Sequence, residues 1–342
     1  MVRRRSAKPL FTGSNPVAAS INLLWIFMPR VQASIFWAFI FVLTSTLPAF
    51  AAKPTVNFGV ETGYLRGNTT YDITLGTGTS ELKWPLDMYM AGFKYSLSYK
   101  DLGFSVSYLK APSRRYGTFM EDTDLELNGS SSGSSQASRL IYSETDLKAE
   151  GNVANIGAHL FLMHYGHSSC GLRAGYSYYS FTYSGYDTSQ VTTGSENRGV
   201  FVPGHVIYYK VDYGSWYAGL EYRLELLGRM YLFANLDYSP KVRVRDKDDH
   251  LLRYKVSRGN CTGEGVSISL SAMYMLAHGW CAYVDGIYGR IRTDGVQDQV
   301  WYGDDPGTSF NETGYAIIGI DQDIDLDLRY IGIGLVYTFQ VE

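Results

Sequence analysis

Apolar and polar residues alternate along much of this chain. The alternation is clearest over residues 89–99, where large apolar side chains are separated by small or polar ones, and it returns over 104–108 and 268–276. Residues 100–103 are typical of a tight turn between the first two segments. Successive side chains on a β-strand point to opposite faces, so the pattern predicts strands with one apolar face and one polar face.

The apolar face is rich in aromatic residues, and the chain contains 29 tyrosines and 36 glycines. A water-soluble sandwich also has a period of two. It seldom carries so many aromatic side chains on one face while the other face stays small and polar. An outer-membrane barrel, with lipid outside and a polar interior, explains the pattern better.

The connections between the predicted strands are alternately short and long, as in outer-membrane barrels with short periplasmic turns and longer extracellular loops. Short turns are expected near 100–103, 165–169, 226–229 and 277–279, and long loops near 66–81, 111–145, 187–202, 246–260 and 293–315. Four turns and five loops join ten strands. We therefore predict an all-β fold, a ten-stranded antiparallel transmembrane β-barrel with an extracellular extension, formed by residues 52–342 as one domain.

Residues 1–51 are predicted to contain a signal peptide preceded by a spurious extension. Arg30 precedes an apolar run over residues 35–43, and a small-residue cleavage site follows at 49–51. The run is too short to cross a bilayer as a helix, which needs about 20 residues. Because a complete signal can begin at Met28, the residues before it are expected to be spurious.

Charge and cysteine content bear on which partners and cofactors the protein is expected to bind. Without residues 1–51, the chain has 25 basic and 33 acidic residues and a formal charge of −8, which gives no indication of a nucleic-acid partner. Cys170, Cys261 and Cys281 are an odd set without metal-ligand spacing, so one disulfide stays open and no metal site or other cofactor is expected.

Two short acidic clusters lie on the side of the predicted long loops. Asp122 and Asp124 are two residues apart, as are Asp248 and His250, so each pair points the same way on a strand. Either cluster alone is explained by a solvated, charged loop. Together across a barrel mouth they would form a carboxylate pair facing a carboxylate–histidine pair, with room for a water between them. That arrangement suits hydrolysis on the extracellular side.

Two changes in the alternation bear on this site. Extending the parity of residues 230–238 would put Asp248 and His250 on the lipid side, so we predict a bulge at Pro240 that reverses the register. Near the C-terminus, apolar residues change parity between 324–328 and 331–335, which predicts either a second bulge or passage out of the membrane.

The order and spacing of four segments resemble those of the omptin family of outer-membrane proteases. The segments are 120–124, 174–181, 209–222 and, above all, 246–250, and the resemblance extends over residues 54–339. It implies a ten-stranded barrel that rises above the bilayer. It also implies that Asp248 and His250 are the catalytic couple, that Asp122 and Asp124 face them, and that Asp246 helps to bind the substrate.

The physical chemistry of these residues agrees with that assignment. The pKa of a histidine lies near neutrality, so His250 can act as general base, while a neighbouring carboxylate orients the ring. Two close carboxylates resist ionising together, so one of Asp122 and Asp124 can keep a proton while the pair holds water or polarises the scissile carbonyl. Water is the nucleophile, and no covalent intermediate is needed.

The chain departs from the family at two places. The family's second pocket acid would fall at residues 68–71, which contain no glutamate, and Asp72 and Glu61 are the candidates to replace it. The preference for basic residues at the cleaved bond is therefore open. Lipopolysaccharide, implied as a lipid partner and activator, would meet Tyr178 and Asp212 where basic residues are expected.

The sequence thus predicts an aspartic-type endopeptidase of the outer membrane that acts on polypeptides. The alternative, from another class, is a barrel without enzymatic activity that serves as an adhesin, a receptor or a narrow pore. The fold alone does not distinguish these functions, because one barrel architecture hosts many tasks.

Overall fold

The computed structural model describes residues 53–75, 78–128, 136–192, 199–306 and 309–340. Residues Pro54–Glu342 form one compact unit, and the predicted signal peptide lies outside the described residues. The elements are β1 (Thr55–Leu75), β2 (Gly78–Pro85), β3 (Met88–Tyr99), β4 (Leu102–Asn128), β5 (Gln136–Tyr165), β6 (Ser168–Thr192), β7 (Gly199–Leu226), β8 (Met230–His250), the 3-10 helix η3 (Leu251–Arg253), β9 (Lys255–Met275), β10 (Trp280–Trp301) and β11 (Ala316–Gln340).

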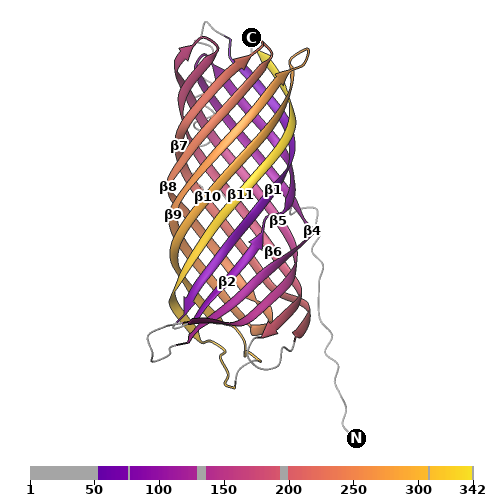
Figure 1. Ribbon diagram of the computed structural model, residues 1–342, viewed down its shortest axis with the longest axis vertical. Coiled ribbons are helices and arrows are strands. Elements are labelled where there is room, and N and C mark those ends of the chain that lie inside the picture. The colour runs from indigo at the N-terminus through magenta and orange to yellow at the C-terminus, as the bar shows by residue number, and fades with distance from the viewer. Residues whose placement is uncertain (1–52, 76–77, 129–135, 193–198, 307–308, 341–342) are drawn as a thin grey trace, which may run out of the picture. The chain divides into compact units, whose positions relative to one another are not determined.

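The strands form a closed antiparallel ring (Figure 1). From β4 to β11 each strand pairs with the next one in the sequence, and β11 pairs with β1 to close the sheet. The short strands β2 and β3 share one position between β1 and β4, separated by Leu86 and Asp87. The eleven strands therefore occupy ten positions in the ring, which confirms the predicted ten-stranded barrel.

The strands continue far into the segments that were predicted to be long loops. Residues 111–128 belong to β4 and pair with 136–151 of β5, so the prediction of a loop over 111–145 was wrong for residues 111–128 and 136–145. The turn positions at the other end were right, since short turns join β3 to β4, β5 to β6, β7 to β8 and β9 to β10. Near the mouth the inner face of these strands carries polar residues such as Ser143 and Thr145, and the outer face is largely polar as well, so the alternation that marks a membrane strand is lost there.

The apolar face of the wall changes sides along the barrel. Near the short turns the outer face is apolar, with Ile331 61% and Ile333 59% exposed. Towards the other end the inner face is apolar, and Ile324 and Leu326 are completely buried. Strand β11 pairs with β1 without any register shift, so of the two predicted alternatives passage out of the membrane, and not a second bulge, accounts for the parity change.

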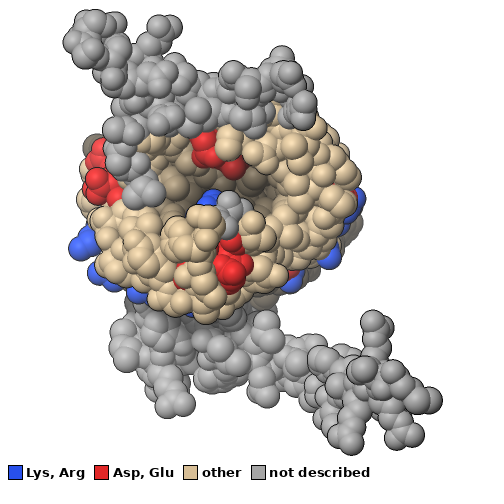
Figure 2. All heavy atoms as spheres, turned by 90° about the horizontal axis from the view of Figure 1, so that it is seen from below, with Lys and Arg blue, Asp and Glu red and all other residues tan. Residues whose placement is uncertain are grey.

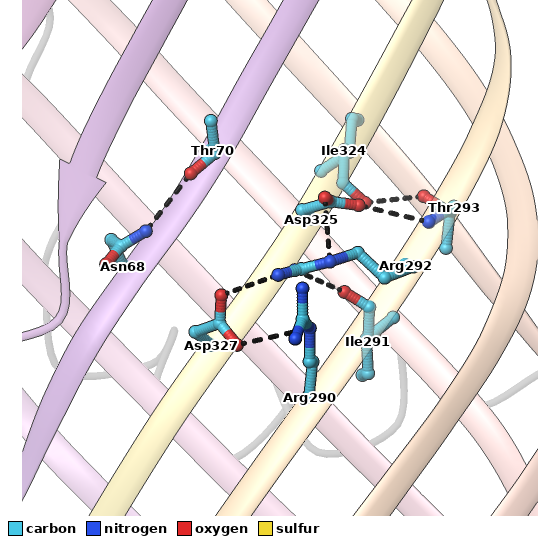
Figure 3. Close-up of polar contacts among 9 residues, drawn as sticks. All are labelled: Asn68, Thr70, Arg290, Ile291, Arg292, Thr293, Ile324, Asp325 and Asp327. Carbon is cyan, nitrogen blue, oxygen red and sulfur yellow. Dashed lines mark hydrogen bonds and ion pairs between the residues drawn. The ribbon is translucent and has the colours of Figure 1, made fainter.

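The outer wall above the apolar band carries ion pairs instead of lipid-facing side chains. Arg292 on β10 contacts Asp325 at 3.1 Å and Asp327 at 2.9 Å on β11, and Arg290 lies 3.8 Å from Asp327 (Figure 3). Such charges are costly in hydrocarbon and cheap in water. They mark this part of the strands as the extension outside the bilayer.

The interior of the extension is filled by a packed core. The ring of Trp84 stacks on Tyr209 with 4.5 Å between ring centroids, and Tyr183 lies 5.2 Å from Trp84. Leu86 and Met88, on either side of the break in the second strand position, are fully buried beside them. This core forms a floor beneath the outer end of the barrel.

The predicted bulge at Pro240 is confirmed. The pairing of β8 with β9 shifts between Ser239 and Val242, and the pairing of β8 with β7 shifts between Trp216 and Ala218. Beyond the shift Val242 and Val244 are buried in the core. The register therefore reverses, and the acidic end of β8 points into the barrel.

Two further features of the described residues can be stated briefly. Cys170, Cys261 and Cys281 are all free thiols, so the disulfide left open by the sequence does not form. No helix among the residues that the structure describes is long and apolar enough to cross a bilayer.

A buried polar cluster holds the wall together inside the membrane-spanning part. The ammonium group of Lys94 lies 2.8 Å from Glu61 and also contacts Asp285, and the hydroxyl groups of Tyr283 and Tyr330 donate to Glu61. The cluster links β1, β3, β10 and β11 across the closure of the ring.

We predict that Lys94→Met destabilises the barrel, because Glu61 and Asp285 would be left without their cation. Breaking a buried ion pair costs roughly 3–5 kcal/mol. The measurement is the temperature at which the folded, faster-migrating band disappears on SDS gels. Lys110→Met is the control, because Lys110 forms an exposed pair with Glu150 that contributes about 1 kcal/mol or less. Equal effects of the two substitutions would contradict the prediction.

Candidate active site

The acidic pair on β4 lies inside the mouth of the barrel. Asp122 is paired in register with Leu82 on β2 and Ser143 on β5, both buried, so its side chain shares their inward face. Asp124, two residues on, lies beside Ser80. The hydroxyl group of Ser80 donates a hydrogen bond of 3.4 Å to Asp122. The pair is thus held by strand pairing and not by a loop.

The aspartate–histidine couple lies on the inward face of β8. Asp248 is only 1% exposed, and its Oδ2 lies 2.8 Å from Nε2 of His250. This contact occupies one ring nitrogen and leaves Nδ1 for another partner. The bulge at Pro240 sets the parity that turns both side chains inward.

The two pairs face each other across a hollow. Burial, followed by the negative charges of Asp124 and Asp248, raises the pKa of Asp122 to about 7, although Ser80 and Lys255 act in the opposite sense. An effect of Asp248 on Asp122 requires that the two strands bring them close together. Figure 2, which looks into this end of the barrel, shows acidic side chains on opposite sides of the hollow.

Asp246 lies one inward position below Asp248 and is 7% exposed. Burial, with a contribution from the charge of Asp248, raises its pKa to about 7, against a hydrogen bond from Gln322 that lowers it. The Gln322 amide donates to Oδ1 of Asp246 at 3.1 Å, and Oδ2 has no hydrogen-bond partner among the described residues. Asp246 therefore offers one buried acceptor to a substrate.

The sequence did not identify the other polar residues near Asp246. The Tyr71 hydroxyl group donates to Oε1 of Gln297 at 2.7 Å, and both residues are buried. The negative charges of Asp248 and Asp246 both raise the pKa of Tyr71, after burial as the main cause. A signal for Gln322 existed, because it interrupts a row of inward apolar residues on β11 between Ile320 and Ile324.

The two suggested replacements for the second pocket acid are not in this pocket. Glu61 belongs to the cluster around Lys94 in the membrane-spanning part. Asp72 is paired with Asp323 and Glu81, on the opposite face of β1 from the buried Tyr71, and lies on the outer wall. The geometry of β1 explains both outcomes. Asp72 is one residue from Tyr71 and therefore lies on the other face of the strand, and Glu61 is ten residues from Tyr71, which is about 33 Å along the strand.

The residues considered for a lipid contact divide between the two sides of the wall. Arg173 points inward and lies 3.2 Å from Asp237, so it is not part of the outer surface. The Tyr178 hydroxyl group donates to Asp212 on the outside. A basic stripe of Lys241, Arg243 and Arg245 is exposed on the outer face of β8.

No group of three or more potential metal ligands is present among the residues that the structure describes. The side chains described around the hollow are carboxylates, one imidazole and nearby polar groups.

The fold is that of an outer-membrane β-barrel with an acidic hollow at its outer end, and the comparisons specify the family. The model of the omptin family matches residues 52–339, and the chain belongs to this family of outer-membrane aspartic-type endopeptidases. No curated protein sequence matched the chain.

Solved structures agree with the fold. The outer-membrane protease OmpT from Escherichia coli has a TM-score of 0.67 at 18% identity, with 83% of this chain and 97% of that chain covered. The outer-membrane protein OprG from Pseudomonas aeruginosa has a TM-score of only 0.33 at 13% identity, with 85% and 97% covered.

Asp246→Asn is predicted to stabilise the barrel at pH 8 by about 2–4 kcal/mol and to have little effect at pH 4. The folded state holds a proton on Asp246 up to about pH 7, whereas the unfolded chain loses it near pH 4. The stability of the parent therefore falls as the pH rises through this window, and asparagine removes that loss. Thermal unfolding at both pH values measures it, with exposed Asp321→Asn as control. A stabilisation that does not depend on pH would contradict the assignment.

Proposed function

We propose that the hollow at the outer end of the barrel is the peptidase active site and that Asp248 and His250 activate the attacking water there. The observation that carries this proposal is the 2.8 Å contact between Asp248 and His250, opposite a carboxyl group whose pKa is about 7. His250 takes a proton from water, and Asp248 orients the ring and stabilises its charged form.

Asp122 and Asp124 complete the reaction from the other wall. Near neutral pH Asp122 retains a proton for part of the time, because burial and Asp124 raise its pKa to about 7. In this form it donates a hydrogen bond to the scissile carbonyl oxygen, while Asp124 holds the water. Water attacks the carbonyl carbon, and the carbonyl electron pair moves to the oxygen. When this tetrahedral intermediate collapses, the C=O bond re-forms, the C–N bond breaks, and the leaving amine takes the proton from His250.

Asp246 is the proposed binding group for a substrate side chain. Its unpaired oxygen would accept a hydrogen bond from a donor that enters the hollow. Neither Glu61 nor Asp72 supplies a second pocket acid beside it, so a cation gains less here than in a pocket built with two carboxylates for that purpose. We therefore propose polypeptide substrates, with basic side chains accepted rather than required.

The extracellular direction and the lipid partner belong to the same proposal. The site lies at the end opposite the four short turns, which in outer-membrane barrels face the periplasm. The basic stripe of Lys241, Arg243 and Arg245 stands directly beyond lipid-facing Leu236 and Tyr238 on β8. A lipid phosphate at that height would suit the stripe, so lipopolysaccharide is the proposed lipid contact.

His250→Ala and Asp122→Ala are each predicted to lower peptide hydrolysis by roughly 100-fold to 10,000-fold, since each removes a proton-transfer or hydrogen-bonding group. Refolded parent and variants are incubated with a mixed peptide library, with and without lipopolysaccharide, and the products are identified by mass spectrometry. His205→Ala is the matched control, because His205 is exposed and stacks on Tyr186.

Unchanged cleavage in both variants would exclude these residues from the site. No cleavage by the parent under either lipid condition would favour the adhesin or pore. The buried core around Trp84 leaves little room for the latter.

The pH dependence gives a separate prediction. If protonated Asp122 polarises the carbonyl, kcat/KM falls as the pH rises above about 7, where the carboxyl group loses its proton. Asp122→Asn keeps an N–H donor that does not titrate, so its lower activity should be flat over pH 7–9. The profile is measured with one peptide at substrate concentrations far below KM. An alkaline decline that survives in Asp122→Asn would show that another group titrates.

A further inference from the structure

A buried lysine that the mechanism above does not use lies beside the aspartate–histidine couple. Lys255 opens β9 and is paired in register with His250 on β8, so both side chains point into the hollow. It is 7% exposed, although lysine is among the residues that are least often buried. A buried ammonium group beside the aspartate–histidine couple is therefore unusual.

The local structure fixes Lys255 in this place. The chain leaves β8 through η3, and Tyr254 then adopts a left-handed conformation with φ 48° directly before β9. The carbonyl oxygen of Tyr254 accepts a hydrogen bond of 2.8 Å from Tyr302, and the two rings pack edge to face at 5.9 Å. On the other side Lys255 pairs with Trp301, whose ring centroid lies 5.8 Å from Nζ.

Lys255 has no direct counter-ion. Among the described residues no carboxylate lies within 4 Å of its Nζ. Arg253, which is nearby, is already paired with Asp305 at 2.8 Å. Burial and the charge of Arg253 lower the pKa of Lys255, whereas Asp248, Asp124 and Asp305 raise it. The lysine therefore stands among the acids of the hollow without being neutralised by any one of them.

We propose that Lys255 is a further catalytic residue, whose ammonium group stabilises the negative charge that develops on the scissile carbonyl oxygen. This inference rests on the proposed function. As water adds to the carbonyl carbon, the π electron pair moves to the oxygen, and Lys255 attracts it without transferring a proton. A preorganised positive charge inside a poorly hydrated site contributes most at this step.

Lys255→Met tests the proposal, because methionine has a similar length and no charge. We expect kcat to fall by roughly 100-fold or more with KM little changed, since the charge acts in the transition state. Lys255→Arg should recover part of the loss. Lys247→Met is the control, because Lys247 is the neighbouring outward-facing lysine of β8 and pairs with Asp249.

The pH profile provides a readout that a purely structural role would not move. Burial and the charges of Asp124 and Asp248 raise the pKa of Asp122, whereas the charge of Lys255 lowers it. In Lys255→Met the alkaline decline of kcat/KM should therefore shift to higher pH. Folding is checked for every variant by its faster migration on SDS gels.

The outcomes separate the two proposals. An active parent, with kcat of Lys255→Met within about threefold of it, or with only KM raised, overturns the role of Lys255 and leaves the peptidase site intact. If Lys255→Met fails to fold, Lys255→Arg decides. A kcat between those of the parent and His250→Ala, with an unchanged pH profile, supports the charge role, whereas a kcat equal to that of the parent or as low as that of His250→Ala overturns it. A parent without activity overturns the proposed function and this inference together.

Discussion

The backbone hydrogen bonds of the closed sheet constrain everything else in this protein. In a bilayer every N–H and C=O group must find a partner within the protein, and the pairing of β11 with β1 leaves no free edge. The same ladder of backbone hydrogen bonds continues beyond the apolar band, although water could satisfy the N–H and C=O groups there. The mouth of the barrel is consequently a rigid wall of strands, on which Asp122 and Asp248 are held at fixed heights.

The interior is divided between two kinds of packing by this continuous wall. Within the membrane, the cluster of Lys94, Glu61 and Asp285 satisfies polar groups that face inward. Further out, aromatic side chains such as Trp84 and Tyr209 fill the lumen. The acids of the hollow thus lie above an apolar floor. Burial there raises the pKa of Asp122 and Asp246 and makes their protonation depend on pH near neutrality.

Features that depend on local periodicity were predictable from the sequence. The alternation over residues 89–99 matches β3 (Met88–Tyr99), and the conflict of parity at Pro240 located a real bulge. Features that depend on long-range register were not. Gln322 reaches Asp246 across 76 residues of sequence, and only the pairing of four strands brings them together. The prediction of a loop was wrong for residues 111–128 and 136–145, because near the mouth inward residues such as Ser143 and Thr145 are polar too and the alternation that marks a strand is lost.

The aromatic floor beneath the hollow limits the route by which a peptide can enter and leave the barrel. A peptide that enters from the outside cannot leave through the far end, because fully buried Trp84 and Tyr183 close the passage. In the proposed active site, the substrate and both products would therefore enter and leave through the same opening at the outer end of the barrel. At the proposed site, compact globular proteins would not fit through this opening. Extended or locally unfolded polypeptides could enter, be cleaved and leave again.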